Sequence, residues 1–208
     1  MLKAITIKDD EKFLRQVSSI VDFNDKELHQ NLQDIREYCT FNSGLYAMAC
    51  IQLGIPKRIV YIKSTKPNDT TANAESDQIL MINPEIISKK GRTEFWEACV
   101  SGLENFGLIE RPYEIVVKYQ NENGDYQIEK FEGFSSTVIS HELDHLDGIF
   151  HMDRAKKLLQ MPATERVEFR KSHPYKVISK DCEFSYSPID KKILEKEEQN
   201  SALLFVFL

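Results

Sequence analysis

The sequence predicts an α+β fold of one domain, in which antiparallel strands pack around a central helix, and three observations support this. Helical patterns come first, strand patterns fill the middle of the chain, and a further helix follows them. Helices and strands in separate blocks are typical of α+β domains. The chain has 208 residues, of which 41% are hydrophobic, and this is enough for one domain with its own core.

The N-terminal part contains two amphipathic patterns with helical spacing. Residues 9–21 (DDEKFLRQVSSIV) predict a first helix, and residues 24–40 predict a second one that begins at Asn24 or Asp25 as its cap. Residues 57–63 (KRIVYIK) are a short apolar run rich in β-branched residues, which predicts a buried strand.

The middle of the chain combines extended patterns with turns. Residues 64–78 are polar and predict a mobile surface loop. Residues 79–87 (ILMINPEII) and 93–101 (TEFWEACVS) each predict an extended segment. Residues 113–133 contain two β-rich runs around NENGD, which predicts a β-hairpin.

The strands lead into the helix that forms the centre of the predicted fold. Residues 134–148 (FSSTVISHELDHLDG) predict this helix, with a start at Ser135 or Ser136 and Gly148 near its end. Charged helical material follows as a C-terminal extension after about residue 155. No linker divides the chain, so we expect residues 1–208 to form a single domain.

Bulk properties narrow the classes of partner and compartment. The net charge of −6 argues against nucleic acid or an anionic membrane as the main partner. The N-terminus becomes charged too early for a secretory signal, and no apolar run approaches the roughly 18 residues of a membrane span. We therefore expect a cytoplasmic protein whose four cysteines are free thiols.

The stretch HELDHLDGIFH contains the residues of a metal site. His141 and His145 are four residues apart, so a helix presents both on one face toward a single ion. Glu142 between them is placed to act as general base on a water at the metal. This stretch alone does not decide the third ligand. His151 would complete a zinc endopeptidase pattern, whereas Cys99 would complete a Cys-His-His set.

Each choice of third ligand implies roles for further residues. In the endopeptidase reading, Met161 is the methionine beneath the site, and Glu165 is the ligand in a variant of that reading. In the cysteine reading, a soft thiolate favours Zn²⁺ or Fe²⁺, and the fourth position stays open for water. Gln52, at the end of LYAMACIQLGIP, is either a polar end to a buried segment or an amide donor to developing negative charge.

Three separated segments together resemble the peptide deformylases: AMACIQLG, EACVS and HELDH, with INPEI and IERPYEIVVKY as matching flanks. The resemblance covers roughly residues 5–155 and implies one divalent ion, Fe²⁺ or Zn²⁺, which Ni²⁺ or Co²⁺ can replace. It further implies Cys99, His141 and His145 as the metal ligands. The endopeptidase reading explains only one of the three segments, and we therefore favour the cysteine.

The resemblance also implies roles for the remaining site residues. Glu142 would be the acid and base, while Gln52 and the backbone N–H of Val100 would form the oxyanion hole. An ion pair between Glu97 and Arg111 would hold the cysteine strand. The implied reaction removes formate from N-formylmethionine of new proteins, so the partners are formylated N-terminal peptides and, transiently, the ribosome.

The chain departs from the family pattern where the substrate backbone is expected. Glycines of the family correspond to Leu45, Ala47 and Ala98 here, and Tyr46 replaces a small aliphatic residue. Glycine serves where a backbone approaches a ligand closely, so we expect weaker activity or a shifted substrate preference. The alternatives are a metal-binding relative without catalysis and the endopeptidase that uses His151.

Overall fold

The structure is a computed structural model that describes residues 2–42, 45–63 and 78–187. The predicted mobile loop at residues 64–78 lies, apart from its last residue, outside these ranges. The helices are α1 (Ile7–Leu14), α2 (Leu28–Phe41), α3 (Phe134–Leu146) and α4 (Ala163–Ser172), with short 3-10 helices η1 (Cys50–Leu53) and η3 (His151–Arg154). The strands are β1 (Ala47–Ala49), β2 (Ile59–Ile62), β3 (Ile79–Ala98), β4 (Asn105–Arg111), β5 (Glu114–Gln120), β6 (Tyr126–Glu132), β7 (Lys157–Gln160) and β8 (Lys176–Glu183).

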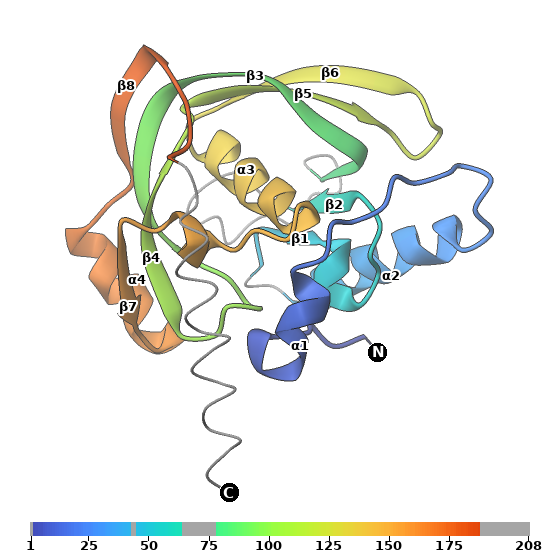
Figure 1. Cartoon of the computed structure of the whole chain (residues 1–208), viewed down its shortest axis with the longest axis horizontal. Coiled ribbons are helices and arrows are strands. Elements are labelled where there is room, and N and C mark those ends of the chain that lie inside the picture. Colours follow the sequence, from blue (N-terminus) through green and yellow to red (C-terminus); the bar gives the residue numbers. More distant parts are fainter. Residues whose placement is uncertain (1, 43–44, 64–77, 188–208) are drawn as a thin grey trace, which may run out of the picture.

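The strands of the described residues form one antiparallel sheet that curves around α3 (Figure 1). The sheet order is β1-β2-β3-β4-β7, and β3 also pairs with β5 and β8, while β6 pairs with β5. One apolar cluster fills the space between the sheet and α3, and a second lies between the sheet and α2. This confirms the predicted α+β domain with antiparallel strands around a central helix.

Strand β3 is the longest element, and it organises the sheet. Its 20 residues include the whole of the first predicted extended segment and residues 93–98 of the second, whereas residues 99–101 lie beyond its end. The charged stretch between the two segments has no apolar pattern, but β5 and β8 supply backbone partners that keep it extended. Gly91 has a φ of +69°, and a Cβ there would lie 2.6 Å from the Cβ of Tyr113, so the strand bends where only glycine fits.

Helix α3 is almost completely enclosed, because Ser136–Leu146 are all buried. The helix begins at Phe134, one residue before the earlier of the two predicted starts, and the Ser136 hydroxyl donates to the carbonyl of Pro112 at 2.7 Å. The predicted cap of α2 is also displaced, since the Asp25 carboxylate accepts from the N–H of Glu27 in a turn before the helix. The side chains that the sequence predicts at the helix starts thus form hydrogen bonds in the tertiary structure or in a turn instead.

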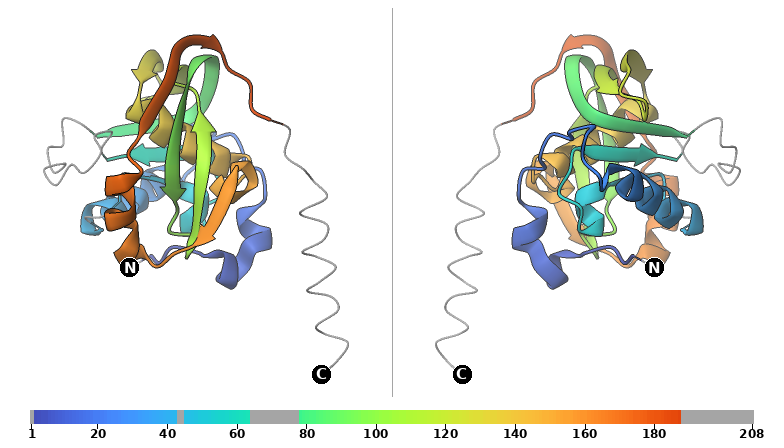
Figure 2. Two further views of the ribbon diagram at one scale, coloured as in Figure 1. Left: turned by 90° about the vertical axis from the view of Figure 1, so that its left-hand side faces the viewer. Right: turned by 90° about the vertical axis from the view of Figure 1, so that its right-hand side faces the viewer.

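The predicted helical extension after residue 155 needs correction, because this region contains helix α4 between strands β7 and β8. Strand β7 pairs with β4, and β8 lies along β3, as Figure 2 shows from the side. Both added strands are largely exposed, so their charged residues resemble an exposed helix in sequence. The open edges of β3 and β4 provide hydrogen-bond partners, and these make the two segments strands rather than helices. No helix in the described part of the chain is long and apolar enough to cross a membrane.

The turn after α3 allows a direct test of this packing. Gly148 has a φ of +71°, and a Cβ there would lie 2.1 Å from the carbonyl oxygen of Arg15. Gly148→Ala should therefore lower the free energy of unfolding by about 2–4 kcal/mol, from left-handed strain plus backbone overlap. Gly124→Ala is the matched control: its φ is +86°, but the added methyl would meet only ordinary contacts with Phe23. Urea unfolding that finds equal losses in both variants would contradict the packing of α1 against this turn.

Candidate metal centre

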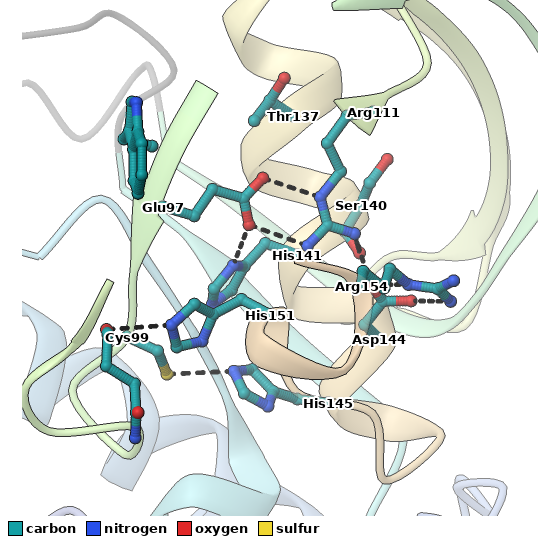
Figure 3. Close-up of polar contacts among 12 residues, drawn as sticks. Glu97, Cys99, Arg111, Thr137, Ser140, His141, Asp144, His145, His151 and Arg154 are labelled. Atoms are coloured by element: carbon teal, nitrogen blue, oxygen red, sulfur yellow. Dashed lines mark hydrogen bonds and ion pairs between the residues drawn. The ribbon is translucent and has the colours of Figure 1, made fainter. Parts of the chain in front are cut away.

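Three side chains with metal-binding atoms meet at the end of β3 and the inner face of α3. Cys99 follows the last residue of β3, and His141 and His145 are one helical turn apart. Their donor atoms all lie within 4.8 Å of one another, all three residues are buried, and Cys99 Sγ is 3.2 Å from His145 Nε2 (Figure 3). Tetrahedral zinc with sulfur and nitrogen ligands separates these atoms by roughly 3.3–3.6 Å. The set therefore fits one divalent ion.

A tight turn directs Cys99 toward the two histidines. The N–H of Gly102 donates to the carbonyl of Cys99 at 3.1 Å, and Leu103 adopts a left-handed φ of +56°. Gly102 must lack a side chain, because a Cβ there would lie 2.6 Å from the ring of His151. The His151 ring thus packs directly against the turn at Gly102, beside the Cys99 thiol.

His141 is oriented by a buried carboxylate. Its Nδ1 donates to Glu97 at 2.8 Å, which leaves Nε2 for the ion. Glu97 receives two further hydrogen bonds from Arg111, both 2.9 Å long. Burial by itself would favour the neutral acid, but Arg111 and His141 overcome it and hold the pKa of Glu97 well below its usual range. The carboxylate is therefore charged and fixes the tautomer of His141.

Arg111 connects this carboxylate to helix α3. The guanidinium is fully buried, and its Nη1 donates to Asp144, which also accepts two hydrogen bonds of 2.7 Å from Arg154. Asp144 therefore acts on His141 only indirectly, because it holds Arg111, which holds Glu97, which holds the ring of His141.

Glu142 lies between the two histidines on α3 and is 6% exposed. Burial raises its pKa to about 7, although His141 opposes this shift. Within the described part of the chain, its Oε2 has no hydrogen-bond partner. A buried carboxyl that exchanges protons near neutral pH has the property required of an acid and base.

Gln52 and Val100 flank the thiol. The side-chain oxygen of Gln52 accepts from the N–H of Ala49 at 3.0 Å, so its NH₂ group faces the site and donates to Cys99 Sγ at 3.2 Å and Ser101 Oγ at 3.1 Å. Val100 follows Cys99 directly, and its side chain is 41% exposed. The amide of Gln52 is thus held in one orientation, with its N–H groups toward Cys99 and the metal-binding atoms.

His151 lies outside the group of metal-binding atoms. Its Nε2 donates to the carbonyl of Asn105 at 3.1 Å, and its ring stacks on His141 with 5.7 Å between centroids. Burial lowers its pKa to about 4, so the ring is neutral. The residue that completes the endopeptidase pattern in sequence therefore packs against the ring of His141. The three potential donors Cys99, His141 and His145 come together without it.

Sequence reasoning missed two contributors to the site. Arg154 clamps Asp144 from η3, and Ser101 joins Gln52 to the N-terminal segment, because its hydroxyl donates to the carbonyl of Ile5 at 2.7 Å. No local pattern marks either residue, since each contact depends on segments that only the fold brings together.

Comparisons with known proteins point to one family. The polypeptide deformylase family model matches residues 2–161. A peptide deformylase of Wolbachia pipientis subsp. Culex pipiens is 34% identical over 81% of this chain and 96% of its own length. Two solved structures are similar: a probable peptide deformylase from Synechococcus phage S-SSM7 (34% identity, TM-score 0.62, 74% of this chain and 99% of that one) and a Met-Ala-Ser-bound class I type b peptide deformylase from Acinetobacter baumannii (27% identity, TM-score 0.65, 74% and 98%).

Replacing the two competing third ligands separately tests the metal centre. Cys99→Ala should weaken zinc binding by more than about 100-fold, because even residues that only support a ligand contribute 10–100-fold. His151→Ala should change it by less than about tenfold, since that ring binds a backbone carbonyl. Zinc retained after equilibrium dialysis measures both, with near-UV circular dichroism as the check on folding. Loss of zinc from the His151 variant alone would favour the endopeptidase arrangement.

Proposed function

The chain belongs to the peptide deformylase family, and on that premise we propose that it removes the formyl group from N-formylmethionine at the start of new proteins. The observation that carries the proposal is the convergence of one thiol and two imidazoles from separate segments, with a buried carboxyl between the imidazoles. This is a metallohydrolase site for a linear amide. The reaction yields formate and a free N-terminal amine.

Cys99, His141 and His145 would hold the ion, with Fe²⁺ or Zn²⁺ as the metals that suit a thiolate and two imidazoles, and Ni²⁺ or Co²⁺ as replacements. When bound, the ion supplies the Lewis acidity that makes a water molecule nucleophilic at neutral pH. Burial lowers the pKa of His145 well below its usual value, which keeps that ring in the neutral form that binds metals.

Glu142 would move the protons. Its carboxylate accepts a proton from the attacking water and then donates that proton to the leaving amine, so one group serves as base and then as acid. Its position between the ligands, its burial and its unpartnered oxygen support this role. Its burial keeps bulk water away from the proton during the transfer.

Gln52 and the Val100 N–H would stabilise the negative charge on the formyl oxygen. The hydrogen bond from Ala49 fixes the orientation of the Gln52 amide before substrate arrives. One of its two N–H groups, which donate to Cys99 and Ser101, would turn to the formyl oxygen as the charge develops. Val100 lies one residue beyond Cys99, which brings its N–H to the side of the same site. Both donors belong to the segments that flank the thiol.

The free edge of β1 would bind the substrate backbone. Strand β1 is the last strand in the sheet order and pairs only with β2 among the described residues, which leaves one edge for an added peptide. Leu45 and Ala47 pack against the apolar clusters, whereas Ala98 is half-buried beside Cys99. Of the three altered glycines, Ala98 is therefore the one whose methyl group would lie near the substrate.

The site of action follows from the substrate. Formylated N-termini exist on chains that leave the ribosome, so we place the reaction in the cytoplasm with transient contact to ribosomes. The acidic net charge of the chain indicates that such contact is brief, because ribosomal RNA repels it.

Replacing the proposed acid and base tests the mechanism. Glu142→Gln keeps the shape of the side chain but cannot accept the proton, so formate release should fall by about 10²–10⁴-fold. Zinc content should stay unchanged, because Glu142 is not one of the three donors. Formate is measured with formate dehydrogenase on a formyl-Met peptide. Full activity in the variant would refute the assignment, and absence of activity in wild type would favour a metal-binding relative without catalysis.

The altered glycines give a second test of the same reaction. Ala98→Gly should raise kcat/KM on formyl-Met peptides by about tenfold or more, as expected when an overpacking methyl group is removed. Ala47→Gly is the matched control: Ala47 is 8% exposed and packs in the core, so the variant should lose stability without gaining activity. Unchanged or lower kcat/KM in the Ala98 variant would show that this methyl group does not obstruct the peptide.

A further inference from the structure

We propose that Tyr186, in the segment after β8, is a positioning residue that holds the polar network behind the metal ligand His141. This inference rests on the proposed function, since it concerns the same metal centre. The family match ends at residue 161, so Tyr186 lies in a part of the chain that the family model does not describe.

Tyr186 contacts both arginines that hold Asp144. Its ring lies against the guanidinium of Arg154, 3.6 Å from ring centroid to Cζ, and its hydroxyl accepts a hydrogen bond from Arg111 Nη1 at 3.4 Å. Burial raises the pKa of the phenol, so it stays protonated and neutral. One side chain thus closes the far end of the network that begins at His141.

The rest of the C-terminal segment brings Tyr186 to this place. Strand β8 pairs with β3 between Lys90 and Glu94, which carries the chain back over the sheet. Phe184 is buried and meets the Tyr186 ring edge to face, 4.9 Å between centroids. The tyrosine is therefore anchored through strand pairing and an apolar contact before it touches either arginine.

The charges of the network explain why a neutral ring is needed there. Arg111 and Arg154 both donate to Asp144, so two cations share one carboxylate. The negative face of an aromatic ring attracts Arg154 without adding a charge that would compete for Arg111. The ring also excludes water from the Arg154–Asp144 pair, and hydrogen bonds are stronger where water is excluded.

Loss of the ring should be transmitted to the metal. Without it, Arg154 becomes hydrated and releases Asp144, and Arg111 then shifts between its two carboxylates. Glu97 is held by Arg111 and in turn orients His141, so the imidazole loses its fixed direction toward the ion. Residues that orient a ligand in this way contribute 10–100-fold to metal affinity.

Cobalt loading of the full-length protein provides the test. In Tyr186→Ala, the d–d absorption bands of bound Co²⁺ should shift, and transfer of Co²⁺ to a chelator should accelerate by about 10–100-fold. Tyr186→Phe keeps the ring on Arg154 and should stay within about threefold of wild type. Tyr126→Ala is the matched control, because that ring also lies over a cation, Lys118 at 4.9 Å, but is 68% exposed.

The outcomes separate this inference from the proposed function. A Tyr186→Ala protein with the wild-type cobalt spectrum and release rate would overturn the positioning role, even if deformylation is confirmed. A Phe variant as impaired as the Ala variant would overturn the role of the ring. If wild-type protein binds Co²⁺ without a thiolate-to-cobalt charge-transfer band, the Cys99 centre itself is wrong, and both proposals fail together.

Discussion

The buried ion pair between Arg111 and Glu97 is the interaction on which the rest of the site depends. Arg111 is fully buried at the end of β4, Glu97 lies near the end of β3, and Asp144 binds the same guanidinium from α3. Taking these charges out of water is unfavourable, and such pairs are weak evidence for stability. Their value here is geometric, because three elements are fixed to one planar group with directional hydrogen bonds. The thiol two residues beyond Glu97 and the imidazoles on α3 approach one another as a consequence.

His151 illustrates why spacing in sequence does not determine coordination. The stretch HELDHLDGIFH matches the endopeptidase pattern in full, yet the chain turns sharply at Gly148, with a φ of +71°, and returns along α1. The short helix η3 then directs the His151 ring to the Asn105 carbonyl and the back of His141. Stacking on His141 and one backbone hydrogen bond hold the buried ring, and neither contact involves a metal.

Much of the fold and of the donor cluster could be predicted from sequence because the relevant signals are local. The hairpin at residues 113–133 and the helix at 134–148 each have their own periodicity, and both predictions are confirmed. Three short segments identify Cys99, His141 and His145 as candidates, and the structure brings their donor atoms together. Long-range effects were not predictable: the continuity of β3, the strands β7 and β8, and the contacts of Arg154 and Tyr186 all depend on partners distant in sequence.

The two halves of the site differ in how closely they follow the family pattern. The donor cluster and its support contain the residues that the sequence resemblance leads us to expect, whereas the edge at β1 and the end of β3 carry side chains where that resemblance implies glycine. We therefore expect metal affinity typical of the family and an altered substrate preference.

X-ray absorption at the zinc edge tests most directly the claim that Cys99, His141 and His145 bind the ion. For zinc-loaded protein we expect one sulfur at about 2.3 Å and two imidazole nitrogens at about 2.0–2.1 Å. A shell with three imidazoles and no sulfur would contradict it.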